Sequence, residues 1–237
     1  MDGVKLMSRT DTKFLFNEDQ FALMMNMVKD QYRVLEVNGK RISRYKTLYY
    51  DTPGLGLYAK HLTGKLNRYK VRHRTYIETD AGFLEVKFKN NKGRTIKKRI
   101  EEHSPQDLWE GEGKIFLTKM LPFEPGTLVP TMWVNYSRCT LVHRTRPERV
   151  TIDLDLEFVK NETVKKMTGL VVAEVKQEKR TASFFLGMMK AFHIREGGIS
   201  KYCLGIALTD QTVKKNNFKR KLLALKHIIN YDTPPNS

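Results

Sequence analysis

The stretch Lys70-Val71-Arg72-His73-Arg74 places a cation at every second position, and it decides the fold that we expect. In a β-strand, alternate side chains point to the same face. This segment therefore projects its long cations to one side and Val71 to the other. Glu85-Val86-Lys87-Phe88-Lys89 and Lys97-Lys98-Arg99 repeat the pattern. Several such strands side by side predict a sheet with one strongly basic face, which suits a polyanionic ligand.

The charge balance of the whole chain agrees with that pattern. The 237 residues carry 43 Lys and Arg against 26 Asp and Glu, which gives a formal net charge of +17. Such an excess indicates an anionic partner: nucleic acid, polyphosphate, nucleotides or an acidic membrane surface. Nucleic acid is the least favoured of these, because RNA-binding faces usually carry stacking aromatics between their cations. Tyr76 and Tyr136 are exceptions on basic strands that otherwise carry few.

The remaining composition bounds the domain organisation and the compartment. Apolar residues make up 40% of the chain and no low-complexity linker interrupts it, so we expect one domain over residues 1–237, with a core of about 5–208 and a basic helix at about 214–229. Cys139 and Cys203 form no CxxC pair, which indicates free thiols. No signal-like segment and no apolar run of about 20 residues is present. These features predict a cytoplasmic protein without a transmembrane segment.

Hydrophobic periodicity divides the chain into strands and helices. The predicted strands are 4–16, 34–37, 43–50, 66–76, 82–89, 94–101, 131–143, 149–158 and 170–177. The predicted helices are 18–31, 104–121 and 180–193, with one or two helical turns at 55–62 and an irregular segment or short helix at 200–208. Short connections such as Thr79-Asp80-Ala81 indicate an antiparallel meander.

The charged strand faces are expected to turn inward. The apolar stripes of the predicted helices need an apolar surface to pack on, and carboxylates alternate with the cations as they would in a confined network. We therefore predict an α+β fold: an antiparallel β-barrel of about eight strands with a cationic lumen and helices on the outside. The inner face would carry Arg9, Asp11, Lys13, Lys70, Arg72, Arg74, Glu85, Lys87, Lys89, Lys97, Arg99, Tyr136, Arg138, Arg149, Thr151, Asp153, Asp155, Glu174 and Lys176.

The sequence resembles a known family, the VTC domain, which is the polyphosphate polymerase domain of the triphosphate tunnel (CYTH-like) superfamily. The motifs that carry the resemblance keep their order over about residues 5–208. They are Arg9-Thr10-Asp11-Thr12-Lys13-Phe14, Tyr49-Tyr50-Asp51-Thr52-Pro53 with Leu57-Tyr58, Val71-Arg72-His73-Arg74-Thr75-Tyr76, Leu84-Glu85-Val86-Lys87, Ile96-Lys97-Lys98-Arg99, Tyr136-Ser137-Arg138, Val150-Thr151-Ile152-Asp153-Leu154-Asp155, Ala173-Glu174-Val175-Lys176 and Ser200-Lys201-Tyr202.

The resemblance implies a metal-dependent enzyme that extends polyphosphate from the γ-phosphate of ATP, and it implies roles for individual residues. Catalytic candidates that would bind phosphates along the tunnel are Lys13, Arg72, Arg74, Lys87, Lys97, Arg138 and Lys201. Substrate-binding candidates are Arg9, Lys70, Lys89, Arg99, Tyr136, Arg149, Lys176 and Ser200. Glu174 would hold Mn²⁺ or Mg²⁺, and one carboxylate suffices when phosphates supply further ligands. Asp153 and Asp155 are secondary candidates for the metal, but for them and for Glu85 we favour pairing with neighbouring cations.

The sequence is also compatible with other functions. A hydrolase of the same fold would cleave triphosphates, and a non-catalytic module would bind polyphosphate or inositol phosphates. The triphosphatase branch of the superfamily carries ExExK on its first strand, whereas this chain has Arg9-x-Asp11-x-Lys13. The polymerase is favoured because the cationic face continues past what one triphosphate needs. ATP and polyphosphate are the expected partners, and a membrane-protein partner is left open.

Overall fold

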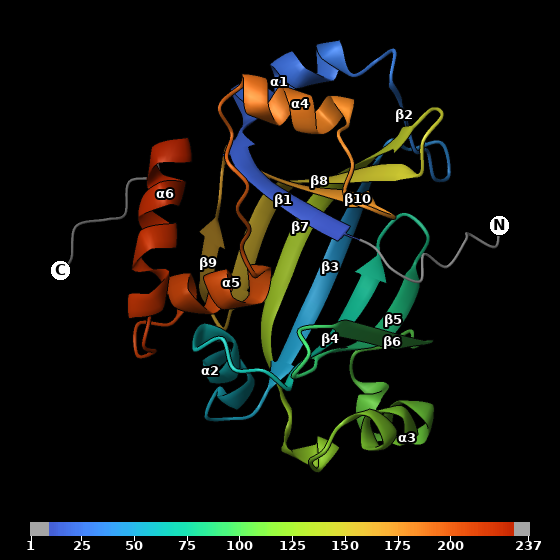
Figure 1. Cartoon of the computed structure of the whole chain (residues 1–237). Helices are drawn as coiled ribbons and strands as arrows, with labels where there is room; N and C mark the ends of the chain where they lie inside the picture. Colours follow the sequence, from blue (N-terminus) through green and yellow to red (C-terminus); the bar gives the residue numbers. More distant parts are fainter. Residues whose placement is uncertain (1–9, 230–237) are drawn as a thin grey trace.

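A computed structural model describes residues 10–229 as one large antiparallel sheet that curls strongly, with helices packed around it (Figure 1). The strands are β1 (Thr10–Asn17), β2 (Tyr32–Val34), β3 (Ile42–Asp51), β4 (Arg68–Tyr76), β5 (Ala81–Lys89), β6 (Thr95–Glu101), β7 (Val129–His143), β8 (Glu148–Lys160), β9 (Thr163–Lys166) and β10 (Leu170–Gln177). The helices are α1 (Glu18–Met27), α2 (Gly56–Leu62), α3 (Gly111–Met120), α4 (Phe184–Ala191), α5 (Lys201–Thr209) and α6 (Lys219–Ile229), with short 3-10 turns η1 (Asp107–Trp109), η2 (Pro125–Thr127) and η3 (Asn216–Phe218).

The sheet has eight strands in its main path, in the order β1-β10-β8-β7-β3-β4-β5-β6. The short strand β2 adds to β7, and β9 adds to β8. The predicted α+β fold with an antiparallel sheet is therefore confirmed. The barrel is approximate, because β1 and β6 end the path and, within residues 10–229, do not pair with each other.

Two large regions of the outer face are apolar and covered by helices, as the alternation predicts. Phe14, Phe16, Ile152 and Val175 pack against α1 and α4 on one half. On the other half, the side chains that pack against η1 and α3 are Leu48, Val71, Leu84 and Val86. Burying these alternate residues is what turns the charged side chains to the inner face.

Helix α5 lies against the inner face, and of the two alternatives for residues 200–208, an irregular segment or a short helix, the structure shows the helix. Ser200 caps it, since its Oγ accepts a hydrogen bond from the Cys203 N–H at 3.3 Å. Its apolar residues share a buried cluster with Met132, Val134, Leu156 and Phe158. A Cβ on Gly205 would lie only 2.5 Å from the Met132 sulfur, so glycine permits this close approach. One end of the interior is thus filled by apolar packing and not by charge.

One local prediction was wrong, and one short strand was missed. Segment 104–121 is not a single helix: η1 and α3 are separate, and Gly111 has a left-handed φ of 51° that no continuous helix contains. The strand β9 was not predicted, because its four residues are too short to show a period. No helix within residues 10–229 has the length and apolar character needed to cross a bilayer.

Candidate active site

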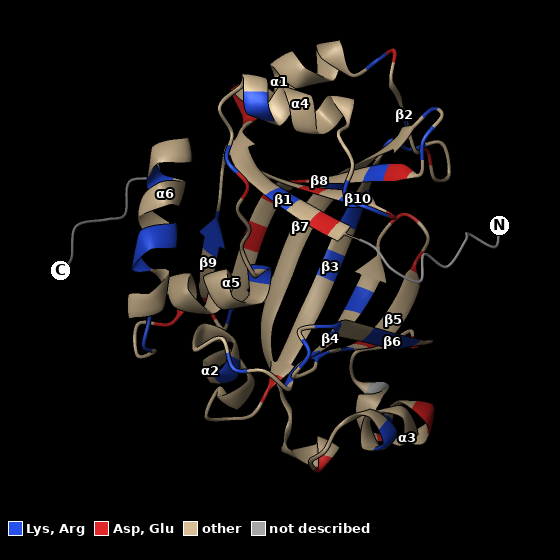
Figure 2. Ribbon diagram, viewed as in Figure 1, with Lys and Arg blue, Asp and Glu red and all other residues tan. Residues whose placement is uncertain are grey.

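The inner face of the sheet brings cations from strands far apart in sequence into one region. Blue bands of Lys and Arg lie on several strands, among them β1 and β4, which are far apart in the strand order (Figure 2). Among the described residues, three inner-face carboxylates, Glu85, Asp153 and Glu174, are each held by two cations. We call these three groups the paired carboxylates, and each joins different elements.

Glu85 on β5 is held by β4 and β6. Its Oε2 accepts from Arg72 Nε at 2.6 Å, and its Oε1 pairs with Lys97. The side chain is only 1% exposed. Burial by itself would raise its pKa, but Arg72, Arg74 and Lys97 outweigh that effect and lower the pKa to about 2. Arg72 also donates from Nη1 to the hydroxyl of Tyr49 at 3.1 Å, so its planar group is fixed in place.

Asp153 on β8 joins β7 and α5. Arg138 donates to both of its oxygens, and Lys201 pairs with Oδ2. Burial opposes ionisation of Asp153, yet these cations hold the pKa of the carboxyl well below its usual range. The expected pairing of Asp153 with neighbouring cations is therefore observed. Asp153 therefore holds two cations in place in this structure.

Glu174 on β10 sits between two lysines. Its Oε1 lies 3.5 Å from Lys13 Nζ, and its Oε2 lies 3.0 Å from Lys176 Nζ. Burial raises the pKa, but Lys176 and Lys13 reverse the effect and bring it to about 2, so the carboxylate is charged at neutral pH. Its side chain is 20% exposed, which leaves it the most accessible of the paired carboxylates.

Two tyrosines hold the guanidinium groups of the interior. The rings of Tyr45 and Tyr136 stack at 5.0 Å with 4° between their planes. The Arg138 guanidinium lies 5.1 Å and 5.3 Å from these ring centroids, and that of Arg74 lies 5.5 Å and 5.9 Å from them. Such cation–π contacts fix the guanidinium planes. Sequence reasoning missed Tyr45, although it alternates with Thr47 and Tyr49 on β3.

Beyond the paired carboxylates lies a cavity of about 350 Å³, which we call the basic cavity. Its lining comprises Lys13, His61, Arg68, Lys70, Lys87, Lys89, Thr95, Gly198, Ile199, Ser200, Cys203, Phe218 and Lys221. Among these described residues there are five lysines and one arginine but no Asp or Glu. A cavity with this excess of positive charge is suited to binding several phosphate groups.

The charges in the basic cavity repel one another. Desolvation and the neighbouring Arg72 and Lys13 lower the pKa of Lys87 to about 8. Desolvation, together with Arg72 and Lys13, also lowers the pKa of Lys70, whose Nζ donates to Ser200 Oγ at 2.9 Å. A bound polyanion would relieve this repulsion. Lys13 belongs to both regions, because it lines the cavity and also pairs with Glu174.

The other candidates lie around this centre. Arg99 is exposed and places its guanidinium 4.3 Å from the Phe83 ring, and Arg149 is exposed on β8. Arg9 lies outside the described residues. Thr151 is buried, and no partner reaches its Oγ1 within the described part of the chain.

Gly198 lies directly against the side chain of Lys13. A Cβ there would lie 2.9 Å from Lys13 Cδ. The stem of Lys13 thus occupies the space that a side chain at this position would need.

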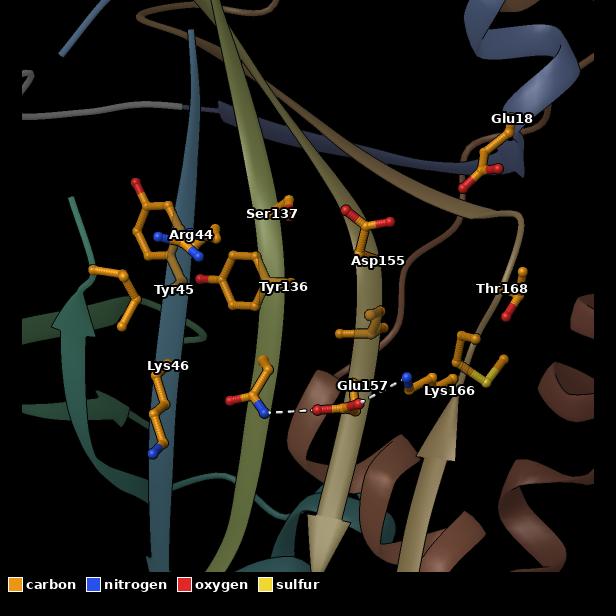
Figure 3. A pocket seen from close by; sticks show the side chains of 14 residues that line it. Glu18, Arg44, Tyr45, Lys46, Tyr136, Ser137, Asp155, Glu157, Lys166 and Thr168 are labelled. Atoms are coloured by element: carbon orange, nitrogen blue, oxygen red, sulfur yellow. Dashed lines mark hydrogen bonds and ion pairs between the residues drawn. The ribbon is translucent and has the colours of Figure 1, made fainter. Parts of the chain in front are cut away.

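Asp155 was wrongly placed on the inner face. The register of β7 and β8 shifts between Asn135 and Ser137, and Asp155 adopts a left-handed φ of 53°. This β-bulge changes which residues face inward beyond it. Asp155 instead lines a cavity of about 520 Å³ on the opposite face of β3, β7 and β8, together with Arg44 and Glu157 (Figure 3). That larger cavity mixes acids and bases, so the basic cavity fits a polyanion better.

The donor set limits how a divalent ion would bind. No group of three His, Cys, Asp or Glu side chains within residues 10–229 is arranged to hold a metal. Mg²⁺ and Mn²⁺ need only one or two carboxylates when phosphates complete their octahedral shell. Glu174 is ionised and partly accessible, so it fits such an ion when a phosphate chain is bound beside it.

A curled antiparallel sheet around a cation-rich interior, with an ionised glutamate among the cations, defines the triphosphate tunnel class of proteins. A comparison with protein families agrees and is more specific. The VTC domain model matches residues 8–112 and 117–210, and this chain belongs to the VTC domain family. A search of curated proteins found no match.

Solved structures share the fold at low sequence identity. A Hippeastrum protein named as an adenylyl cyclase, with a dominant triphosphatase activity, has 14% identity and a TM-score of 0.53, covering 85% of this chain and 96% of its own. A Bacillus halodurans protein named as an adenylate cyclase has 14% identity and a TM-score of 0.51, covering 82% and 96%. These likenesses concern the fold alone.

Proposed function

We propose that this protein is a metal-dependent polyphosphate polymerase. A terminal oxygen of the growing polyphosphate chain attacks the γ-phosphorus of ATP. The bond from that phosphorus to the β–γ bridging oxygen breaks, ADP leaves, and the chain is one phosphate longer. Such a transfer needs little covalent chemistry from the protein, because positioned cations and an in-line acceptor lower the barrier.

The observation that supports the proposal is the acid-free basic cavity. Around the paired carboxylates, Lys13, Lys176, Arg72, Lys97, Arg138 and Lys201 are partly neutralised. The basic cavity adds Lys70, Lys87, Lys89 and Arg68 with no acid in its described lining. A nucleoside triphosphate would not need both regions, whereas a phosphate chain lying across Lys13 would use both.

Individual residues would then bind the phosphates or the metal ion. Arg72 and Arg138 are held by Glu85 and Asp153 in fixed orientations, which suits binding to the phosphates where charge moves during transfer. Glu174 would hold Mn²⁺ or Mg²⁺, an ion that supplies charge neutralisation at the transferring group. ATP and polyphosphate would be the partners. We place the reaction in the cytoplasm, where ATP is present and the free thiols Cys139 and Cys203 stay reduced.

A triphosphatase is the second candidate, because the Hippeastrum protein of the same fold has that activity. In this case water would take the place of the chain terminus as acceptor. The purified protein with ATP and Mn²⁺ distinguishes the candidates. A polymerase yields ADP and a phosphatase-resistant polymer that stains with toluidine blue, and chelation of the metal stops it. Release of free phosphate alone would indicate the hydrolase, and tight polyphosphate binding without turnover would indicate a receptor.

A further inference from the structure

The chain beyond the family match contributes to the basic cavity. The VTC model ends at residue 210, yet Phe218 of η3 and Lys221 of α6 line the cavity beside Lys70 and Arg68. The sequence predicted a basic helix here without a role. Its place beside the basic cavity depends on contacts between residues that are far apart in the chain, so the local sequence pattern did not predict it.

Several contacts hold this C-terminal segment in place. The Tyr58 hydroxyl donates to the Lys214 carbonyl at 3.0 Å, and Asn217 Nδ2 donates to the Leu62 carbonyl at 3.2 Å. Phe218 is 6% exposed and Leu225 is 1% exposed, and both belong to the buried cluster that includes α5. The helix is therefore fixed against the body, and Lys221 has a defined position at the cavity wall.

Lys221 and Arg68 carry positive charges that no ion pair within residues 10–229 neutralises, and both line the cavity. Lys221 has no ion pair within residues 10–229, and its Nζ lies 5.8 Å from the Phe218 ring. Arg68 donates from Nη1 to the Gly64 and Lys65 carbonyls, at 3.0 and 2.6 Å, and thereby anchors its guanidinium. Its Nε is buried and has no hydrogen-bond partner in the described part of the chain. A buried donor of this kind is costly unless a ligand accepts from it.

We propose that Arg68 and Lys221 form an end subsite that grips the phosphates of a polyphosphate chain farthest from the reacting terminus. This rests on the proposed function, and it names how the same site retains its product. A cation that contacts only distal phosphates slows dissociation of long chains, because each further contact adds to the free energy that release must overcome. The subsite would thus set product length more than the rate of a single transfer.

The test compares Lys221→Gln with Lys219→Gln, a matched lysine that is exposed on the same helix and does not line the cavity. With ATP and Mn²⁺, we expect Lys221→Gln to make polymer several-fold shorter on gels, whereas Lys219→Gln matches the wild type. Equal lengths for the two variants would overturn the proposal. Both sites are exposed, so the thermal midpoints should agree and serve as the folding check.

A binding measurement separates this inference from the proposed function. For labelled long polyphosphate, Lys221→Gln should raise Kd at least threefold and lower the slope of log Kd against log salt by about one, as loss of one phosphate contact does. For tripolyphosphate, the same substitution should raise Kd by a smaller factor. This result would support the subsite even if no polymer is made. Equal losses for the long chain and tripolyphosphate, or no loss for either, would refute it.

Discussion

Arg138 donates from Nε and Nη2 to the two carboxylate oxygens of Asp153, at 2.5 and 2.9 Å. Lys201, the first residue of α5, pairs with the same carboxylate. The Asp153 side chain is 4% exposed. One buried acid therefore fastens the inner helix to β7 and β8 and orients two of the candidate phosphate-binding cations.

Substituting Asp153→Asn should destabilise the fold strongly. It leaves Arg138 and Lys201, whose side chains are each 16% exposed, beside each other without a counter-charge, a situation that costs up to about 3–5 kcal/mol. Urea unfolding measures the loss. Asp155→Asn is the control, because Asp155 is exposed and asparagine tolerates its left-handed backbone. If both variants unfold at the same midpoint, the ion pair does not stabilise the protein.

Acid should weaken the fold through Glu85 and Glu174. Their pKa values are about 2 in the folded chain, below the ordinary value of 4.5, so the unfolded chain binds more protons in this range. Their stabilisation is complete above about pH 4.5 and is lost as the pH falls toward 2. In a pH series of unfolding experiments, Glu85→Gln should be less stable than wild type near pH 6 and approach it at pH 2–3. A difference that stays constant with pH would contradict the pKa shift of Glu85.

Adjacent lysines on β6 should differ sharply in their effect on turnover. Lys97 pairs with Glu85 on the inner face, whereas Lys98 is exposed and points to the other side of the strand. We expect Lys97→Ala to lower kcat/KM for ATP roughly 10²-fold, the size of loss typical for removal of a charge-stabilising group. Lys98→Ala should stay within about twofold of wild type. Similar losses in both would place the reaction outside the curled sheet.

Alkaline pH should weaken phosphate binding. Desolvation and neighbouring cations lower the pKa of Lys97 to about 8, as they do for Lys87, so the free protein loses these charges between pH 7 and 9. A bound polyanion favours the charged form, so binding above pH 8 should take up protons. Calorimetry with tripolyphosphate in buffers of different ionisation enthalpy measures the uptake. Lys87→Arg should flatten the pH dependence, because a guanidinium stays charged. An affinity independent of pH would show that neither lysine titrates near pH 8.

Much of the site was predictable from alternation alone. Lys70, Arg72 and Arg74 share a face because side chains alternate along β4, and Val71 is buried on the other. The same argument correctly paired Glu85 with cations. It failed at Asp155, where the bulge in β8 resets the alternation. It also assigned Arg149 to the inner face without indicating that the side chain is exposed.

Helical contributions to the site were harder to predict. Arg68 continues the alternation of β4 and was available to the same reasoning. His61 and Lys221 stand on helices, where no period marks which residue faces a cavity formed by other elements. Their positions depend on how α2 and α6 pack against the sheet, and this packing joins residues separated by much of the chain.

The amino-acid sequence is enough to tell which side chains share a strand face, since the two-residue period is a local property of extended backbone. The cationic excess and the family motifs can be read from it as well. Which of these faces meet depends on the folded arrangement of the strands and helices. Glu174 reaches Lys13, and Asp153 reaches Lys201, through strand pairing, sheet curvature and the seating of α5. Those arrangements arise from burial of apolar surface between distant segments, which no local pattern encodes.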